Sequence, residues 1–416
     1  MKKHRANLLS IYHAALKAVH GRECVSGWLR QHPQAGSCHV IAIGKAAAAM
    51  AMGALDVLGN QLERMLVITR HGYGEPELSR DSRVRQMESG HPVPDQSSLD
   101  AGQAMLDFIA GTHTSTPLLF LISGGASALV EVLPEDLTLT DLRHVNHWLL
   151  GSGLPIESMN AVRIALSRIK GGRLSAYLQG RKALVLLVSD VPDDDPAIIG
   201  SGLLHPDVDS PLGAIDDFPD WLNDMIVRAS STVSVLDDAC QPEEIIPHHV
   251  VASADHARWA SLQQAQQLGY HTYEHQQRVT GDINVVAAQL SSALADNDPG
   301  LHIWTGETTV ELPEKLGNGG RCQSLALTFA LQQQCHDLRE WLFLAAGSDG
   351  SDGASEAAGA LVDGLSVSRI MAAGLDPRQC LIRADAGTCL NSAQDLIITG
   401  PTGTNVMDIM LGLRLV

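Results

Sequence analysis

The sequence predicts an α/β fold made of two domains, whose sheets are mostly parallel or mixed. Short apolar runs recur along the 416 residues, and most of them are followed by glycine and then by a helix-like pattern. Strands that are apolar throughout are typical of parallel sheets with helices on both faces. A chain of this length favours two domains. The hydrophobic content of 45% is that of a globular protein with a large core.

The expected elements alternate along the chain. Strands are expected at 39–44, 65–70, 117–125, 183–190, 248–253, 301–306 and 341–350. Helices are expected at 46–58, 139–150, 257–268 and 323–334, and an amphipathic helix with Leu8, Ile11 and Tyr12 on its apolar face precedes them. The segment 204–247 is rich in Asp, Glu and Pro. We expect it to connect an N-terminal domain (1–235) to a C-terminal domain (245–416).

The composition limits the partners of the chain. A formal net charge of -18 argues against nucleic acid, because phosphate backbones attract basic surfaces. No apolar run approaches the ~20 residues of a membrane helix, so no membrane contact is expected. The seven cysteines form no CxxC pair, which favours a reduced, cytoplasmic chain. An anionic substrate would therefore need locally placed basic groups and backbone N–H donors.

Two loops after expected strands suit anions. Lys45 opens an alanine-rich helix, where a cation opposes the helix dipole unless an anion meets it; an exposed first-turn lysine is the alternative. Small residues follow the strand at 117–125, and backbone N–H groups there could surround an anion: Ser123, Gly124, Gly125 and Ser127. A tight turn without a ligand is the alternative. No G-x-G-x-x-G follows a strand, which argues against a dinucleotide site.

Two acidic loops also follow expected strands. The first holds Asp190, Asp194 and Asp195, and carboxylates so close together suit Mg²⁺ bound with substrate phosphates. The second holds Asp349 and Asp352 among glycines, which suits metal-phosphate chemistry or a general base. A solvated acidic turn is the alternative in both places.

Two further segments offer basic groups. Asn160, Arg163 and Lys170 share one side of an expected helix that ends at 171–172, and this side could receive a carboxylate. A surface helix with scattered basic residues is equally compatible with the pattern. Arg321 follows a glycine-rich turn and could bind phosphate through two hydrogen bonds.

Nine motifs resemble, in order, those of the class II glycerate kinases, whose C-terminal part is called the MOFRL domain. They run from residue 43 to residue 406: IGKAA, SGHPVPD, SGGASAL, NAVRIALSRIKGGRL, SDVPDDDPAIIGSG, TGETT, GNGGR, AGSDGSDGASEAAGA and TGPTGTNV. The resemblance implies a kinase that uses ATP and Mg²⁺ to phosphorylate the 2-hydroxyl of D-glycerate, giving 2-phosphoglycerate. It also implies a Rossmann-like N-terminal domain, a MOFRL-like C-terminal domain, and an active site in the cleft between them.

The sequence departs from the family pattern at a few positions. Cys322 to Ser324 stand where the family tends to have Asn-Gln-Glu, Leu203 and Leu204 stand where it prefers Pro-Thr, and Pro192 replaces a glycine. These changes keep the charged groups and bear on which hydroxy acid fits.

With the resemblance, each candidate residue receives an expected role. Charge on the transferred phosphoryl group is neutralised by Lys45 and Arg321, and the 2-hydroxyl is oriented or deprotonated by Asp349, with Asp190 as a second candidate. The nucleotide is bound by Ser123, Gly124, Gly125, Ser127, Glu307, Gly317, Asn318, Gly319 and Gly320. The hydroxy acid is bound by His91, Asn160, Arg163, Lys170 and Asp352, and Mg²⁺ by Asp190, Asp194 and Asp195.

Other functions remain open at this point. An NAD(P)H-dependent hydroxypyruvate reductase would share the small hydroxy-acid substrate, and a kinase of a related hydroxy acid would share the chemistry. A catalytically inactive sensor of sugar acids is a third alternative. The expected partners are a small hydroxy acid and a nucleotide, and a homodimer is one of the assemblies left open.

Overall fold

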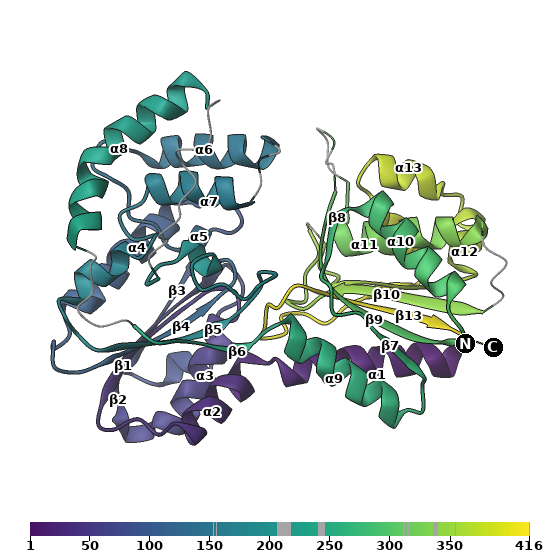
Figure 1. The fold of residues 1–416 in the computed structure, drawn as a ribbon, viewed down its shortest axis with the longest axis horizontal. Helices are drawn as coiled ribbons and strands as arrows, with labels where there is room; N and C mark the ends of the chain where they lie inside the picture. Colours follow the sequence, from purple (N-terminus) through teal and green to yellow (C-terminus); the bar gives the residue numbers. More distant parts are fainter. Residues whose placement is uncertain are drawn as a thin grey trace. The chain divides into compact units, whose positions relative to one another are not determined.

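The computed structural model describes residues 1–152, 154, 156–205, 218–239, 246–310, 313, 317–335, 340–353 and 355–415. The chain forms two compact units (Figure 1). We call Gly21–Val251 the N-terminal unit, and Met1–His20 together with Ala252–Val416 the C-terminal unit. Within the described ranges, no helix is both long and apolar enough to cross a membrane.

The N-terminal unit contains a six-stranded sheet in the order β3-β2-β1-β4-β5-β6. Its strands are β1 (Cys38–Ile43), β2 (Leu62–Arg70), β3 (Val84–Ser89), β4 (Leu118–Ser123), β5 (Ala183–Val188) and β6 (His248–Ala252). The pairings among β1 to β5 are parallel, as expected for strands that are apolar on both faces. The strand order reverses between β1 and β4, so this is the point where ligands bind in sheets of this kind.

Helices cover both faces of this sheet (Figure 1). They are α2 (Gly21–Gln31), α3 (Ala47–Leu58), α4 (Gln96–Ala110), α5 (Ala126–Leu129), α6 (Leu139–Gly151), α7 (Ile156–Ala165) and α8 (Asp220–Ala239), with short 3₁₀ helices η1 (Gly59–Gln61), η2 (Leu78–Arg80), η3 (Arg173–Leu178) and η4 (Ile199–Ser201). Asp95 and Thr138 cap α4 and α6 by accepting a hydrogen bond from a backbone N–H of the first turn.

The segment 204–247 is not simply a connection. Part of it forms α8, whose Leu222 and Met225 are buried with Val162 of α7 and Leu149 of α6 in one hydrophobic cluster. This helix therefore belongs to the core of the N-terminal unit, because its apolar face is covered there. Residues 206–217 and 240–245, which include most of the predicted boundary, lie outside the described residues.

The C-terminal unit contains a mixed sheet in the order β12-β11-β10-β13-β9-β7, with β8 paired to β9. Its strands are β7 (Thr272–Glu274), β8 (Val279–Asp282), β9 (Gly300–Thr309), β10 (Trp341–Gly347), β11 (Gly359–Asp363), β12 (Leu396–Ile397) and β13 (Asp408–Arg414). The central pairs β9–β13, β13–β10 and β10–β11 are antiparallel. The α/β prediction is confirmed, with a parallel sheet in one unit and a mixed sheet in the other.

One face of this sheet carries α1 and α9, and the other carries the remaining helices (Figure 1). The helices are α1 (Lys2–Ala18), α9 (Ala254–Gln267), α10 (Ile283–Asp296), α11 (Arg321–Gln332), α12 (Ser366–Ala372), α13 (Pro377–Ile382) and α14 (Ala386–Ser392), with the 3₁₀ helix η6 (Gln333–Cys335). The apolar face of α1 is buried, and α1 packs against α9. The first helix of the chain thus belongs to the C-terminal unit, whereas the predicted boundaries place it in the N-terminal domain.

Two expectations about local structure are wrong. The chain is not fully reduced, because Cys380 and Cys389 form a disulfide that joins the adjacent short helices α13 and α14. The helix expected to reach residue 172 ends at Ala165. Ser167 accepts hydrogen bonds from the N–H groups of the next turn, and the Arg173 guanidinium donates to the carbonyl of Ser167, so the chain turns there.

Candidate active site

The loops after β1 and β4 lie against each other at the point where the strand order reverses. The Lys45 N–H donates to the carbonyl of Gly124 at 3.0 Å, and the Ala46 N–H donates to Oγ of Ser123 at 3.0 Å. Ser123 is fully buried, and the Lys45 side chain is half-buried just before α3. The structure therefore brings together two loops that the sequence linked to phosphate binding.

His91 belongs to the same group of residues. Gly125 has a left-handed backbone (φ +85°), and a Cβ placed there would lie 3.0 Å from the His91 ring and 3.3 Å from Cγ of Lys45. The glycine is thus required by its conformation, and it also leaves room for two side chains with N–H donors. His91 and Lys45 therefore both lie against Gly125 of the Ser123–Ser127 loop.

A chain of polar side chains continues from this loop. The hydroxyl groups of Ser127 and Ser201 lie 2.8 Å apart, and Ser201 donates to Oδ1 of Asn160 at 3.3 Å. Arg163 donates to the same Oδ1 at 3.2 Å, and burial lowers the pKa of Arg163. Ser201 was missed by the sequence analysis, although it has a left-handed backbone (φ 57°) that is uncommon outside glycine. Ser127 is therefore linked to Asn160 through Ser201, and Asn160 also contacts Arg163; the roles of these residues in ligand binding stay predictions.

Lys170 is in a different environment. Its side chain is 2% exposed, and its ammonium group is paired with the carboxylate of Glu131, which is also 2% exposed. Ser167 donates to the second Glu131 oxygen at 2.6 Å. Burial lowers the pKa of Lys170, while Glu131 acts to raise it. The charge of Lys170 is thus balanced inside the unit, which leaves Arg163 as the more accessible cation of the two.

The acidic loop after β5 offers one unsatisfied oxygen. Oδ1 of Asp194 is buried and has no hydrogen-bond partner among the residues that the structure describes, and Asp194 has a left-handed backbone (φ 56°). Asp195 instead accepts the Ala197 N–H at 2.9 Å, which holds the turn. Across the described ranges, no three His, Cys, Asp or Glu side chains form a group able to hold a metal ion. A cation here would need ligands from a substrate, as Mg²⁺ usually takes from phosphates.

In the C-terminal unit, Arg321 is the first residue of α11 and is held by two acids. Its Nε and Nη2 donate to the two oxygens of Asp408 at 2.7 and 2.9 Å, and its Nη1 lies 2.8 Å from an oxygen of Glu307. Burial acts to lower the pKa of Arg321, but Asp408 and Glu307 outweigh it and raise the pKa. Asp408, the first residue of β13, was missed by the sequence analysis.

Asp349 and Asp352 lie beside this arginine but have separate contacts. Oδ1 of Asp349 accepts the N–H and the hydroxyl of Ser351 at 3.0 and 3.1 Å. The two oxygens of Asp352 accept the N–H groups of Cys322 and Gln323 at 3.1 and 2.8 Å, so Asp352 caps α11. Burial raises the pKa of Asp352 to about 7, against the lowering effect of these N–H donors. Its predicted contact with substrate stays a prediction.

The glycine-rich loop before Arg321 is anchored on the turn between α13 and α14. The N–H of Gly317 donates to the carbonyl of Arg383 at 3.0 Å, and the N–H of Asn318 donates to the Asp385 carboxylate at 2.9 Å. Gly320 lies against Asp352, because a Cβ there would be 2.2 Å from Oδ1 of that residue. The loop and the Asp352 turn therefore position the start of α11 together.

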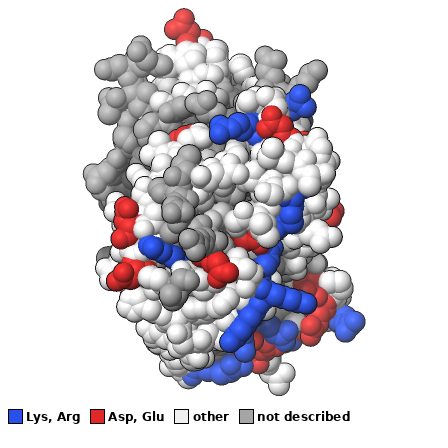
Figure 2. Space-filling view, turned by 90° about the vertical axis from the view of Figure 1, so that its right-hand side faces the viewer, with Lys and Arg blue, Asp and Glu red and all other residues white. Residues whose placement is uncertain are grey.

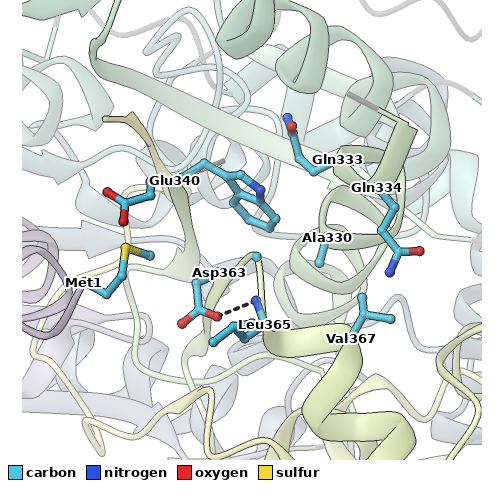
Figure 3. A pocket seen from close by; sticks show the side chains of 10 residues that line it. Met1, Ala330, Gln333, Gln334, Glu340, Asp363, Leu365 and Val367 are labelled. Atoms are coloured by element: carbon cyan, nitrogen blue, oxygen red, sulfur yellow. Dashed lines mark hydrogen bonds between the residues drawn. The ribbon is translucent and has the colours of Figure 1, made fainter. Parts of the chain in front are cut away.

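A pocket of about 400 Å³ lies at the other end of β10 (Figure 3). Trp341 and Asp363 line it, together with Met1 and Glu340, and Asp363 accepts the N–H of Leu365 at 2.9 Å. None of the residues predicted from the sequence lines this pocket. Trp341 begins β10, whereas Asp349 follows its last residue, so the pocket is separate from the candidate site.

The charges that could receive an anion are local. Acidic and basic side chains lie near one another on the face shown in Figure 2, where the acids are red and the bases blue. Because the formal net charge is -18, attraction of an anion has to come from individual groups such as Lys45, Arg163 and Arg321.

Known proteins resemble this chain over almost its whole length. Residues 7–219 match the family "Domain of unknown function (DUF4147)", and residues 300–408 match the "MOFRL family". D-glycerate 2-kinase of Thermotoga maritima is 31% identical over 389 residues, which cover 90% of each chain. A putative hydroxypyruvate reductase of Agrobacterium vitis is 34% identical and covers 90% of this chain and 98% of that protein. The crystal structure of glycerate kinase from Thermotoga maritima matches 100% of both chains with a TM-score of 0.82 and 28% identity.

Proposed function

We propose that this chain, which belongs to the MOFRL family of glycerate 2-kinases, transfers a phosphoryl group from ATP to the 2-hydroxyl of D-glycerate. The products are 2-phospho-D-glycerate and ADP. The observation that carries the proposal is the similarity to D-glycerate 2-kinase of Thermotoga maritima over 90% of both chains. The groups around Lys45 and Arg321 fit this chemistry, since phosphoryl transfer depends on positioning and on charge neutralisation.

In the N-terminal unit, we assign the phosphate groups to Lys45 and to the loop from Ser123 to Ser127. The reversal of strand order between β1 and β4 supports this assignment. We assign the glycerate carboxylate to Arg163 and Asn160, which are hydrogen-bonded, and keep His91, next to Gly125, as a further candidate. Arg163 is preferred over Lys170 because the Lys170 ammonium group is already paired with Glu131.

In the C-terminal unit, we assign Arg321 to the developing negative charge of the transferred phosphoryl group. Asp349 orients the 2-hydroxyl and accepts its proton as the bond from that oxygen to the γ-phosphorus forms and the bond to ADP breaks. The Gly317–Gly320 loop offers backbone N–H groups to the nucleotide phosphates.

Asp190 and Asp194 would hold Mg²⁺, with Asp195 keeping the turn in place. The buried Asp194 oxygen without a described partner supports this assignment, because a buried carboxylate oxygen needs a cation or a donor. A Mg²⁺ ion held there would neutralise part of the phosphate charge. A cytoplasmic location and a homodimeric assembly remain predictions from the sequence.

The first test measures ADP formation with ATP, Mg²⁺ and a panel of D-glycerate and related hydroxy acids. Phosphorus NMR of the product then shows which oxygen carries the phosphoryl group. We expect Lys45→Met to lower kcat by about 10²- to 10³-fold, because one preorganised cation is lost. Lys182→Met is the matched control, since Lys182 is an exposed lysine of the same unit and should keep wild-type turnover. Near-normal turnover of Lys45→Met would contradict the role of Lys45.

An NAD(P)H-dependent hydroxypyruvate reductase is the second candidate, because a relative from Agrobacterium vitis carries that name. The strand order of the N-terminal unit is compatible with a dinucleotide site. However, the loop after β1 reads Gly44-Lys45-Ala46 and lacks the glycine pattern of such sites. Loss of NADH absorbance with hydroxypyruvate, without ATP-dependent product formation, would favour the reductase.

A further inference from the structure

The Arg321 guanidinium is held by a carboxylate that no sequence motif indicated. Asp408 begins β13, opposite Gly306 of β9 and Gly347 of β10, and its side chain is 1% exposed. Both Asp408 oxygens accept hydrogen bonds, one from Nε and one from Nη2 of Arg321, at 2.7 and 2.9 Å. Two parallel hydrogen bonds fix the plane of the guanidinium as well as its position.

This contact determines which edge of the guanidinium is presented. Because Nε and Nη2 are committed to Asp408, the remaining edge is that of Nη1, which lies 2.8 Å from a carboxylate oxygen of Glu307. The Glu307 side chain is 47% exposed, whereas Asp408 is buried in the sheet. One acid is therefore a fixed support, and the other is a surface partner.

The neighbouring acids cannot replace Asp408 in this contact. Asp352 uses both oxygens to cap α11, and Asp349 accepts hydrogen bonds from Ser351. Asp408 is also attached to the sheet, which is rigid compared with the loops that carry Asp349 and Asp352. Its position sets where Arg321 can place a positive charge.

We propose that Asp408 is the positioning residue that orients Arg321 toward the transferred phosphoryl group. The proposal rests on the proposed function, because it gives a role in that reaction to a contact that could also be purely structural. A lysine in place of Arg321 could not be held in this way, since an ammonium group has no planar edge for two hydrogen bonds.

The test is Asp408→Asn, measured as kcat, as KM for ATP and for D-glycerate, and as melting temperature. We expect kcat to fall about 10- to 100-fold with both KM values nearly unchanged, because a displaced arginine loses contacts made in the transition state. Asp395→Asn is the matched control. Asp395 is also 1% exposed and pairs with Arg369, whose exposure of 34% matches the 35% of Arg321. It should lower the melting temperature and keep wild-type kcat.

A double variant separates positioning from general damage. If Asp408 acts through Arg321, then adding Asp408→Asn to Arg321→Ala should leave kcat within about 2-fold of the single Arg321→Ala variant. Three outcomes would each overturn the proposal. They are a wild-type kcat in Asp408→Asn, a further 10-fold loss of kcat in the double variant, and an equal loss of kcat in Asp395→Asn.

A rescue experiment tests the proposal if Asp408→Asn does not fold. Millimolar guanidinium added to Arg321→Ala should raise turnover by at least about 5-fold, because the Asp408 carboxylate can hold the free ion. Absence of rescue would overturn the proposal.

If the wild-type protein forms no ADP from any hydroxy acid, the proposed function fails instead. The Nε–H NMR signal of Arg321 then still reports the contact: it should be sharp in the wild type and broadened in Asp408→Asn, and an identical signal in both would exclude a positioning contact.

Discussion

The C-terminal unit contains two similar aspartate–arginine pairs at opposite ends of one sheet. Asp408 pairs with Arg321 beside the last residue of β10, and Asp395 pairs with Arg369, which also binds Asp363 opposite Leu342 at the start of β10. Each of the pairing aspartates is 1% exposed, and the arginines are 35% and 34% exposed. Burial and charge therefore do not distinguish the two pairs.

The difference lies in the other donors of each arginine. Arg369 donates from Nε to the carbonyl of Ala393, from Nη1 to Asp363 and from Nη2 to Ser366, and all three partners are buried. Arg321 uses Nε and Nη2 on Asp408, and its Nη1 faces the exposed Glu307. An arginine whose nitrogens all bind buried groups supports the fold, whereas one that keeps an edge on an exchangeable partner can meet a ligand.

The largest expected effect tests this distinction directly. Arg321→Ala should lower kcat by on the order of 10³-fold, as loss of an arginine that neutralises a transferred phosphoryl group does. Arg369→Ala should leave kcat near the wild-type value. Both variants should lose about 3 kcal/mol of unfolding free energy, because each leaves a buried aspartate with less compensation. Turnover and urea denaturation of both variants measure the two quantities.

An equal loss of turnover in Arg321→Ala and Arg369→Ala would contradict this distinction between the two arginines. Arg369 would then influence the reaction as strongly as Arg321. Hydrogen bonds from every guanidinium nitrogen to buried groups would not identify an arginine as purely structural.

The second prediction concerns pH, because the pKa values of two individual acids, Asp352 and Asp363, are shifted in opposite directions. Burial raises the pKa of Asp352 to about 7, from an ordinary value of 3.8. Between these values the folded state binds more protons than the unfolded state, so stability decreases as pH rises from about 4 to 7. The full change is on the order of 4 kcal/mol at about 1.4 kcal/mol per pKa unit. Asp352→Asn should flatten this part of the stability curve.

Asp363 should show the reverse behaviour. Burial acts to raise its pKa, but the hydrogen bond from Arg369, helped by Arg5, outweighs burial and lowers it. Its contribution to stability is therefore present above the ordinary pKa and is lost as pH falls toward the lowered value. Asp363→Asn should flatten the acid side of the curve. Urea denaturation at intervals from pH 3 to 8 measures both variants, and curves parallel to the wild type would contradict the assignments.

Much of the fold could be predicted from the sequence because its central strands are apolar on both faces. All seven expected strands are present, including β4 and β10. β3 was missed because Val84–Ser89 is mostly polar, and its burial is only partial. β7, β8, β11 and β13 were also not among the expected strands, although β11 and β13 are buried. The antiparallel pairing of β10 with β11 and β13 also could not be predicted, since direction depends on connections and packing rather than on residue pattern.

The loops of the candidate site could be predicted, but their partners could not. Glycine, serine and aspartate after apolar runs identified the loops at Lys45, Ser123 and Asp349. The residue that holds Arg321 lies 87 positions away, and the one that neutralises Lys170 lies 39 positions away. Only the folded chain brings such residues together, so sequence spacing offers no signal for Asp408 or Glu131.

The smallest expected effect comes from Glu307, the exposed partner of Arg321. The sequence predicts that Glu307 binds the nucleotide, and in the structure its carboxylate lies 2.8 Å from Nη1 of Arg321. If Glu307 competes with the phosphoryl group for Arg321, then Glu307→Gln should lower KM for ATP. Exposed ion pairs contribute about 0.2–1 kcal/mol, which corresponds to at most about a 5-fold change.

The two roles predict opposite signs, so a small effect is still decisive. If Glu307 binds the nucleotide, Glu307→Gln removes a contact and KM for ATP should rise. If Glu307 competes with the phosphoryl group for Arg321, Glu307→Gln removes that competition and KM for ATP should fall. Asp255→Asn is the control for removing one negative charge, since Asp255 is 53% exposed and pairs with Arg278 in the same unit. It should leave KM unchanged. Measurements at low and high salt sharpen the result, because screening should shrink the effect of Glu307→Gln if it is electrostatic.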